Sequence, residues 1–291
     1  MPRNISICAI LVSTKTAGRL LPEKMNLQLL DFIGNKLRPV EIRLLAKYIF
    51  RIRRKAIQLK DNSIYFIDPV SNLGLQLQKQ GTYEPETTDV IVSLLSAGDT
   101  FVDLGCNEGY FSIVAGKICG MQGKVFAIEP QERLWEIIKK NGELNGLSNI
   151  ELIPYGIGAE NGELLLKLYP STNTGASSFS DAYNFTISAP WLRSKLYGTQ
   201  LVKVVTLDHL RYQFPADIKL IKIDIEGFEY EALIGATLLL REKVFKNILI
   251  EIHPQALHGM AQNESGIDEL LASYGYLKRV VMKQLNLYTL Q

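Results

Sequence analysis

Short apolar runs alternate with amphipathic helical stretches from residue 100 onward, and this alternation constrains the fold more than any other feature of the chain. Stretches with the spacing of a helix separate most of the apolar runs. These stretches cover about 110–118, 131–144, a segment that begins at about 230, and 267–274. Strands that alternate with helices predict βαβ units, which build a parallel sheet covered on both faces. Five runs have the composition of buried strands: 100–104, 124–129, 150–154, 218–224 and 247–252.

The last two apolar runs, 276–281 and 285–290, lie too close together for a crossover helix. They predict an antiparallel hairpin at the end of the sheet. The expected fold is therefore α/β and Rossmann-like, with a seven-stranded, mostly parallel sheet and an antiparallel C-terminal hairpin. The alternation stops between Gly162 and Thr206, where strands over 163–169 and 201–205 enclose a Ser/Thr/Asn-rich loop over 170–180. A long loop inside a compact domain is usually functional.

The N-terminal part follows a different pattern. Apolar residues recur at helical spacing from Val40 to Ile57, after Pro39. The runs 56–60 and 63–67 then predict a hairpin. A boundary follows at 81–86, where Pro85 begins another helix that ends before Gly98. We therefore predict a basic N-terminal extension of helices and a β-hairpin over residues 1–80, and a main domain over residues 81–291.

The formal net charge of +2 is unevenly distributed. Residues 1–60 contain thirteen Lys or Arg and three acids, which gives +10, and the other 19 basic and 27 acidic residues give −8. Such a basic segment can mark a nucleic-acid or membrane contact. We expect a solvated helical surface instead, with weak membrane-surface contact through the basic helix as an alternative. A nucleic-acid partner is not expected, and no oligomeric state is predicted.

Composition excludes several classes of protein. With 47% hydrophobic and 21% charged residues in 291, the chain is globular rather than disordered. No apolar run reaches the roughly 18 residues of a membrane-spanning helix. The run Ile5–Val12 is short for a signal peptide and lacks a clear cleavage site. Three unclustered cysteines indicate a reducing compartment, so we expect a cytoplasmic protein.

A glycine turn follows the first strand of the predicted sheet, where open parallel sheets bind ligands. Gly105 and Gly109 allow the backbone to approach a ligand closely. Asn107 stands where the dinucleotide pattern G-x-G-x-x-G needs its second glycine, and the Gly-Lys-Ser/Thr of a phosphate-binding loop is absent. Asp103 beside the turn would repel a phosphate and suits a cation, such as the amino group of S-adenosylmethionine (SAM). Glu129, which ends the second strand, can accept both hydroxyls of a ribose.

More acids follow the fourth and fifth strands. Asp224 and Glu226 are spaced by two and point to the same side if the strand continues through them. Glu251 and His253 repeat this spacing on the next strand. Because an unpaired buried charge is costly, we expect these side chains to line the same cleft as Asp103 and Glu129. A structural network of ion pairs that includes Lys222 is the alternative.

These motifs resemble the FkbM family of SAM-dependent methyltransferases over about residues 81–254. The resemblance implies a class I methyltransferase fold, SAM as cofactor, and O-methylation of a hydroxyl on a sugar or natural-product acceptor. Two positions depart from the family: Cys106 replaces the usual Ala, and Ala159 stands where Asp is common, so we assign no adenine-contacting acid there. The matching stretches are 81–86, 99–112, 125–130, 141–147, 176–179, 205–208, 221–229 and 250–254.

The expected roles follow from the residues and the resemblance together. For catalysis, Asp224 or Glu226 orients or deprotonates the acceptor hydroxyl, and His253 is a weaker candidate. Carboxylates could also bind magnesium or calcium, but we predict no metal site. The residues predicted to contact the acceptor are Ser177, Ser178, Trp191 and Glu251. The predicted cofactor-binding residues are Asp103, Gly105, Cys106, Asn107, Gly109, Tyr110, Glu129, Pro130 and Asp224.

Two other functions remain open at this point. One is an RNA ribose methyltransferase that uses the basic segment as an electrostatic footprint. The other is a catalytically silent binding module with the same fold. The presence of Asp103, the two glycines of the turn and Glu129 argues against the silent module.

Overall fold

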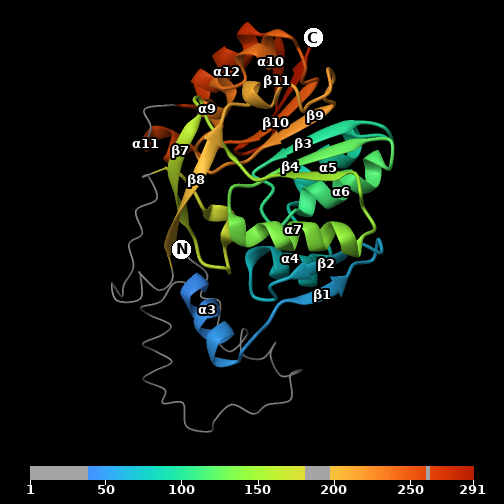
Figure 1. The fold of residues 1–291 in the computed structure, drawn as a ribbon, viewed down its shortest axis with the longest axis vertical. Helices are drawn as coiled ribbons and strands as arrows, with labels where there is room; N and C mark the ends of the chain where they lie inside the picture. Colours follow the sequence, from blue (N-terminus) through green and yellow to red (C-terminus); the bar gives the residue numbers. More distant parts are fainter. Residues whose placement is uncertain (1–38, 181–196, 260–262) are drawn as a thin grey trace.

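The computed structural model describes residues 39–180, 197–259 and 263–291 (Figure 1). The N-terminal part comprises α3 (Pro39–Ile49), the hairpin of β1 (Lys55–Gln58) and β2 (Ile64–Ile67), α4 (Asn72–Gln80) and α5 (Pro85–Leu94). The main sheet comprises β3 (Thr100–Leu104), β4 (Lys124–Ile128), β5 (Ile150–Ile153), β9 (Leu220–Ile223), β10 (Asn247–Glu251), β11 (Tyr276–Met282) and β12 (Leu285–Leu290).

The remaining elements connect or extend the main sheet. A small sheet has the order β6-β8-β7, with β6 (Gly156–Ile157), β7 (Gly162–Leu168) and β8 (Gly198–Val205). Short 3-10 turns are η2 (Thr174–Ala176) and η3 (Asp208–Leu210). The helices are α6 (Tyr110–Cys119), α7 (Glu132–Leu144), α9 (Glu229–Ile234), α10 (Thr237–Arg241), α11 (Pro254–Gly259) and α12 (Glu264–Ser273).

The main sheet has the order β11-β12-β10-β9-β3-β4-β5. Strands β3, β4, β5, β9 and β10 pair in parallel, and β12 is antiparallel to both of its neighbours. The predicted Rossmann-like sheet with an antiparallel C-terminal hairpin is confirmed. The order of the strands reverses beside β3, because β4 lies on one side of it and β9 on the other. Open α/β sheets bind ligands at such a switch point, outside the carboxyl ends of the strands.

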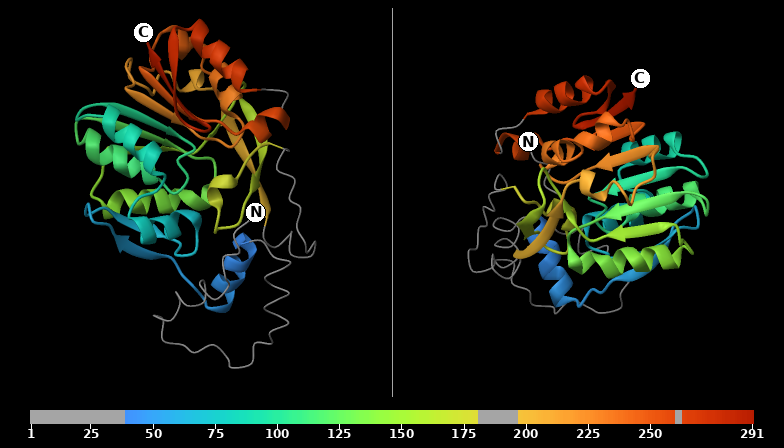
Figure 2. Two further views of the ribbon diagram at one scale, coloured as in Figure 1. Left: turned by 180° about the vertical axis from the view of Figure 1, so that it is seen from behind. Right: turned by 45° about the horizontal axis from the view of Figure 1, so that its top comes forward.

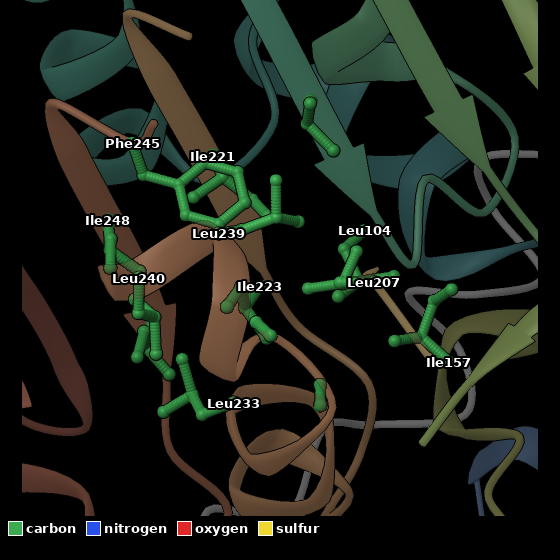
Figure 3. Packing of buried hydrophobic residues seen from close by; sticks show 14 of the residues in the cluster. Leu104, Ile157, Leu207, Ile221, Ile223, Leu233, Leu239, Leu240, Phe245 and Ile248 are labelled. Atoms are coloured by element: carbon green, nitrogen blue, oxygen red, sulfur yellow. The ribbon is translucent and has the colours of Figure 1, made fainter. Parts of the chain in front are cut away.

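Apolar side chains cover both faces of the sheet. In β3, Val102 and Leu104 belong to one buried cluster and Phe101 to the other. Figure 3 shows the first cluster, where Leu104 lies near Ile223 of the neighbouring strand. By the same alternation Asp103 shares the face of Phe101, and its register partner on β9 is Lys222. A buried acid and a buried lysine therefore lie side by side within an apolar layer.

The hairpin of β1 and β2 lies along α7 (Figures 1 and 2). Asn145 Oδ1 accepts a hydrogen bond from the backbone N–H of Ile64 at 3.0 Å, and Asn141 Oδ1 accepts one from Phe66 at 2.7 Å. The hairpin and α4 also bury apolar side chains in the same cluster as Phe101. These side chains are Tyr65, Ile67, Leu73 and Leu77.

The helix predicted from Val40 to Ile57 is wrong beyond Ile49, where α3 ends. Arg51 has a φ of 50°, which a continuing right-handed helix does not allow. Ala56 instead pairs with Phe66 in the hairpin. The backbone pairing of β1 with β2 therefore overrides the helical spacing.

Some of the basic residues expected on a solvated surface form internal ion pairs. Lys47 pairs with the buried Asp68, and its Nζ donates to Ser171 Oγ at 2.9 Å. Arg54 donates to both carboxylate oxygens of Glu108, at 2.8 and 2.7 Å, and Glu108 is 1% exposed. Within the described ranges no helix is long and apolar enough to cross a bilayer.

We expect Arg54→Met to lower the free energy of unfolding by about 3–5 kcal/mol, because it leaves the buried Glu108 carboxylate without its cation. Urea denaturation of the full chain measures this change. Arg53→Met is the matched control, since Arg53 is exposed, and we expect it to stay within about 0.5 kcal/mol of the wild type. Equal losses in the two variants would contradict the prediction.

Candidate active site

A cavity opens at the carboxyl ends of β3, β4, β9 and β10, at the switch point of the sheet. The empty space within the cavity and at its solvent-exposed mouth amounts to about 1030 Å³. Apolar and aromatic groups form part of its wall, and acids form another part. The predicted residues on the wall are Gly105, Cys106, Asn107, Tyr110, Glu129, Pro130, Ser177, Asp224, Glu226, Glu251 and His253.

The glycine turn brings the end of β3 against the end of β9. Gly105 has a φ of 80°, and a Cβ there would lie 2.0 Å from the carbonyl oxygen of Asp224. Gly109 has a φ of 84° and precedes α6. Cys106 is buried, and burial raises the pKa of its thiol well above the ordinary value, so it stays a neutral wall residue rather than a nucleophile.

Glu129 is held by the backbone at the end of β4. Its carboxylate accepts hydrogen bonds from the N–H groups of Asn107 and Gln131, both at 2.9 Å. Burial raises the pKa of Glu129 to about 7, against the effect of these two donors. Each carboxylate oxygen keeps a further lone pair, so Glu129 can still accept hydroxyl groups of a ligand.

Asp103 lies behind the cavity and is not part of its wall. It is fully buried, and its Oδ2 accepts a hydrogen bond from Ser112 Oγ at 2.6 Å. Its Oδ1 has no hydrogen-bond partner among the described residues. Burial raises the pKa of Asp103, although the charge of Lys222 opposes the shift. Asp103 can therefore affect a ligand only through the charge that it presents behind Lys222.

Lys222 stands between the acids at the ends of β9 and β10. It is 2% exposed, and its Nζ lies 3.0 Å from Asp224 Oδ2 and 5.0 Å from the centre of the Phe111 ring. Burial opposes the ionised form of Asp224, but Lys222 and His253 hold its pKa below the ordinary value. Burial and the charge of Asp224 raise the pKa of Glu251 to about 7.

His253 is surrounded by carboxylates. Its Nδ1 lies 3.0 Å from Oε1 of the buried Glu229, and its Nε2 lies 3.4 Å from Glu226 Oε2 and 3.9 Å from Asp224 Oδ1. Burial would lower the pKa of His253, but these acids raise it to about 10. At neutral pH the ring is therefore an imidazolium, which cannot accept a proton. Ligand atoms of Asp224, Glu226 and His253 lie within 4.8 Å of one another, a spacing that could hold a metal ion.

The residues expected to contact the acceptor lie in different places. Ser177 lines the cavity and donates to Gln131 Oε1 at 3.0 Å. Ser178 is buried, and its Oγ donates to the carbonyl oxygen of Glu226 at 2.6 Å, so it supports that turn. Trp191 lies outside the described residues. Glu251 lines the cavity beside Lys222.

Sequence reasoning missed several residues of the wall. They lie in loops and turns that carry no periodic signal. Glu84 is the clearest case, because it lies within the stretch 81–86, which we interpreted as a boundary and as part of the family resemblance without assigning Glu84 a role. The other missed residues are Tyr83, Gln131, Tyr155 and Phe179.

The FkbM methyltransferase domain matches residues 103–278, which is more than half of the chain. This chain belongs to the FkbM methyltransferase family. It is a SAM-dependent methyltransferase, and the cavity described above suits this cofactor. Glu129 offers acceptors for ribose hydroxyls, and the acids near Lys222 suit the cationic part of SAM.

Individual relatives are distant. The chain is 26% identical over 168 residues to a hexuronic acid methyltransferase, AglP, of Haloferax volcanii, which covers 57% of this chain and 62% of that protein. It is 41% identical over 56 residues to a probable cobalt-precorrin-6B C(15)-methyltransferase of Sulfolobus acidocaldarius, 19% of this chain and 29% of that protein. The chain thus spans less than two thirds of either relative. A SAM-dependent methyltransferase structure from Aquifex aeolicus has a TM-score of 0.40 and 17% identity, and covers 73% of this chain and 90% of that one.

We expect this FkbM family member to release protons when it binds S-adenosylhomocysteine (SAH) near pH 6.5. The pKa values of Glu129 and Glu251 are both about 7, so part of each group is protonated there, and the ligand favours the ionised forms. The affinity should rise from about pH 5.5 to about pH 8 and then level off. Calorimetry in two buffers with different protonation enthalpies measures the release.

Glu129→Gln is the control for this experiment, because it removes one of the two titrating groups and should reduce the number of protons released. No proton release, together with an affinity that is constant over the same pH range, would rule out this role for the two acids.

Proposed function

We propose that this protein transfers the methyl group of SAM to a hydroxyl group of a sugar or natural-product acceptor. The supporting observation is the group of carboxylates at the ends of β9 and β10, on the wall of the cavity that also contains Glu129. A carboxylate beside the cofactor can take the proton of a hydroxyl while its oxygen becomes the nucleophile. The three acids concerned are Asp224, Glu226 and Glu251.

SAM supplies a methyl group on a positively charged sulfur, and the sulfur leaves as a neutral thioether. The protein positions the acceptor oxygen in line and holds its proton. Asp224 is a weak proton acceptor because Lys222 and His253, acting against burial, keep its pKa low, so we assign it to orienting the hydroxyl. Glu226 then takes the proton, and His253 Nε2, 3.4 Å from Glu226 Oε2, holds the side chain in position.

A neutral hydroxyl suits this site better than a carboxylate does. Asp224, Glu226 and Glu251 would repel an acceptor carboxylate, whereas a hydroxyl can donate a hydrogen bond to any of them. The hexuronic acid methyltransferase among the relatives supports a sugar acceptor. Ser177, Trp191 and Glu251 are the proposed acceptor contacts, and Ser178 acts by holding the backbone of Glu226.

A transfer assay with methyl-labelled SAM tests this proposal. The acceptors are neutral pyranosides, hexuronates and a short RNA, and mild alkali follows because it cleaves a methyl ester and leaves a methyl ether intact. We expect alkali-stable label on a sugar hydroxyl. Alkali-labile label on a hexuronate would overturn the hydroxyl assignment, label on RNA would favour the ribose methyltransferase, and SAH binding without any transfer would favour a silent module.

We expect Glu226→Gln to lower kcat by about 10²–10⁴-fold while SAH affinity stays within about twofold, because only proton removal is lost. Asp224→Asn should also lower kcat and in addition weaken SAH binding, since it leaves Lys222 without its nearest carboxylate. Glu163→Gln, on the exposed edge of β7, is the control for an acid away from the cavity. Wild-type turnover in both Glu226→Gln and Asp224→Asn, with SAH binding intact, would refute the assignment.

A further inference from the structure

Glu84, the residue before α5, has a left-handed backbone conformation that capping this helix does not require. Its φ of 42° and ψ of 75° lie in the left-handed region, which is unfavourable for a non-glycine residue. Glu84 occupies the N-cap position of α5, where an acid normally accepts a hydrogen bond from the first turn. Its side chain makes no such bond. Residues with strained backbone are common at functional sites, so the surroundings of the Glu84 carboxylate can show its function.

The carboxylate of Glu84 faces the cavity with one oxygen unused. Glu84 lines the cavity, and its Oε2 is buried without a hydrogen-bond partner among the described residues. Burial, followed by the charge of Asp224, raises the pKa of Glu84. The neighbouring Tyr83 hydroxyl favours the ionised form of Glu84 and so acts to lower its pKa. A buried acceptor without a donor is costly, so a ligand that brings an N–H group is expected here.

The charges around Lys222 also require a positively charged ligand. Four acids act on this one lysine, and each of them is buried or half-buried. Even with Lys222 protonated, the fully ionised group has an excess of three negative charges. The sulfonium and ammonium groups of SAM bring two positive charges and its carboxylate brings one negative charge, so bound SAM would offset one of the three. The four acids are Glu84, Asp103, Asp224 and Glu251.

The strand order fits the length of the cofactor. A ribose held by Glu129 lies at the end of β4, and β3 separates this strand from β9, where Lys222 and Asp224 lie. Two strand spacings amount to about 10 Å, which the methionine part of SAM can span from the ribose. The charges of Asp224 and Lys222 act on Glu84, so an ammonium group at the end of β9 lies in the neighbourhood of Glu84.

We propose that Glu84 binds the α-ammonium group of the methionine part of SAM, through its otherwise unpartnered Oε2. The assignment rests on the cofactor of the family and is independent of the acceptor. It makes Glu84 a cofactor-binding residue, with the strained backbone before Pro85 holding its carboxylate on the cavity wall.

Two ligands separate this contact from a general structural effect. SAH carries the ammonium group, whereas 5′-methylthioadenosine retains the adenosine and lacks the whole amino-acid part. We expect Glu84→Gln to weaken SAH binding at least tenfold and to change 5′-methylthioadenosine binding less than twofold, as measured by calorimetry. Glu86→Gln is the matched control, because Glu86 is exposed on the first turn of the same helix, and it should change neither affinity.

Thermal unfolding with and without each ligand shows whether Glu84→Gln is folded. Equal weakening of both ligands, or no weakening of either, would overturn the proposal. Normal SAH affinity with lost turnover would also overturn it, because Glu84 would then act on the acceptor. Since the binding measurements need no acceptor, a failure here is distinct from a failure of the proposed hydroxyl methylation.

For the wild type, the same two ligands give a test that needs no variant. We expect SAH to bind at least tenfold more tightly than 5′-methylthioadenosine, because only SAH places a cation among the acids of the cavity. Equal affinities would overturn the proposal even if Glu84→Gln did not fold.

Discussion

One buried cation, Lys222, allows this sheet to end in a group of acids. Its register partner on the neighbouring strand β3 is Asp103, and Asp224 follows the end of its own strand, β9. Without a cation in this layer, a fully buried Asp103 would be an unpaired charge among apolar side chains. The attraction is strong because the pair is shielded from water. The acids around Lys222 outnumber it, however, and this excess of negative charge can attract a cationic cofactor.

Close backbone packing holds the same acids in place. The turn after β3 touches the carbonyl of Asp224, which only a glycine at position 105 permits. Three non-glycine residues of the cavity wall, Glu84, Asn107 and Glu226, have positive φ values. Ser178 Oγ is bonded to the backbone of Glu226, and Thr174 Oγ1 to Asn107 Oδ1. Strained residues at the site thus depend on hydrogen bonds from the loop before residue 181.

The fold was predictable where one physical signal dominated. Continuous apolar runs predicted the strands of the main sheet, and the short spacing at the C-terminus predicted the hairpin of β11 and β12. The helical pattern from Val40 to Ile57 failed because Ala56 gains a partner in Phe66, and that pairing is not visible in local spacing. α4 was missed as well, although Ser71 caps it by accepting from the N–H of Gly74. Leu73, Leu75 and Leu77 recur there at the spacing of a strand.

The candidate site was predictable chiefly for the acids at the ends of strands and for the glycine turn after β3. Glu129, Asp224, Glu226 and Glu251 are the acids expected there, and all four line the cavity. Asp103 does not line the cavity, because it lies one residue before the end of β3 and its side chain stays within the sheet. Arg54 and Glu108, 54 residues apart, show what local patterns miss. Lys47 and Arg54 of the basic N-terminal segment pair with the buried Asp68 and Glu108, whereas the acids around Lys222 outnumber that lysine.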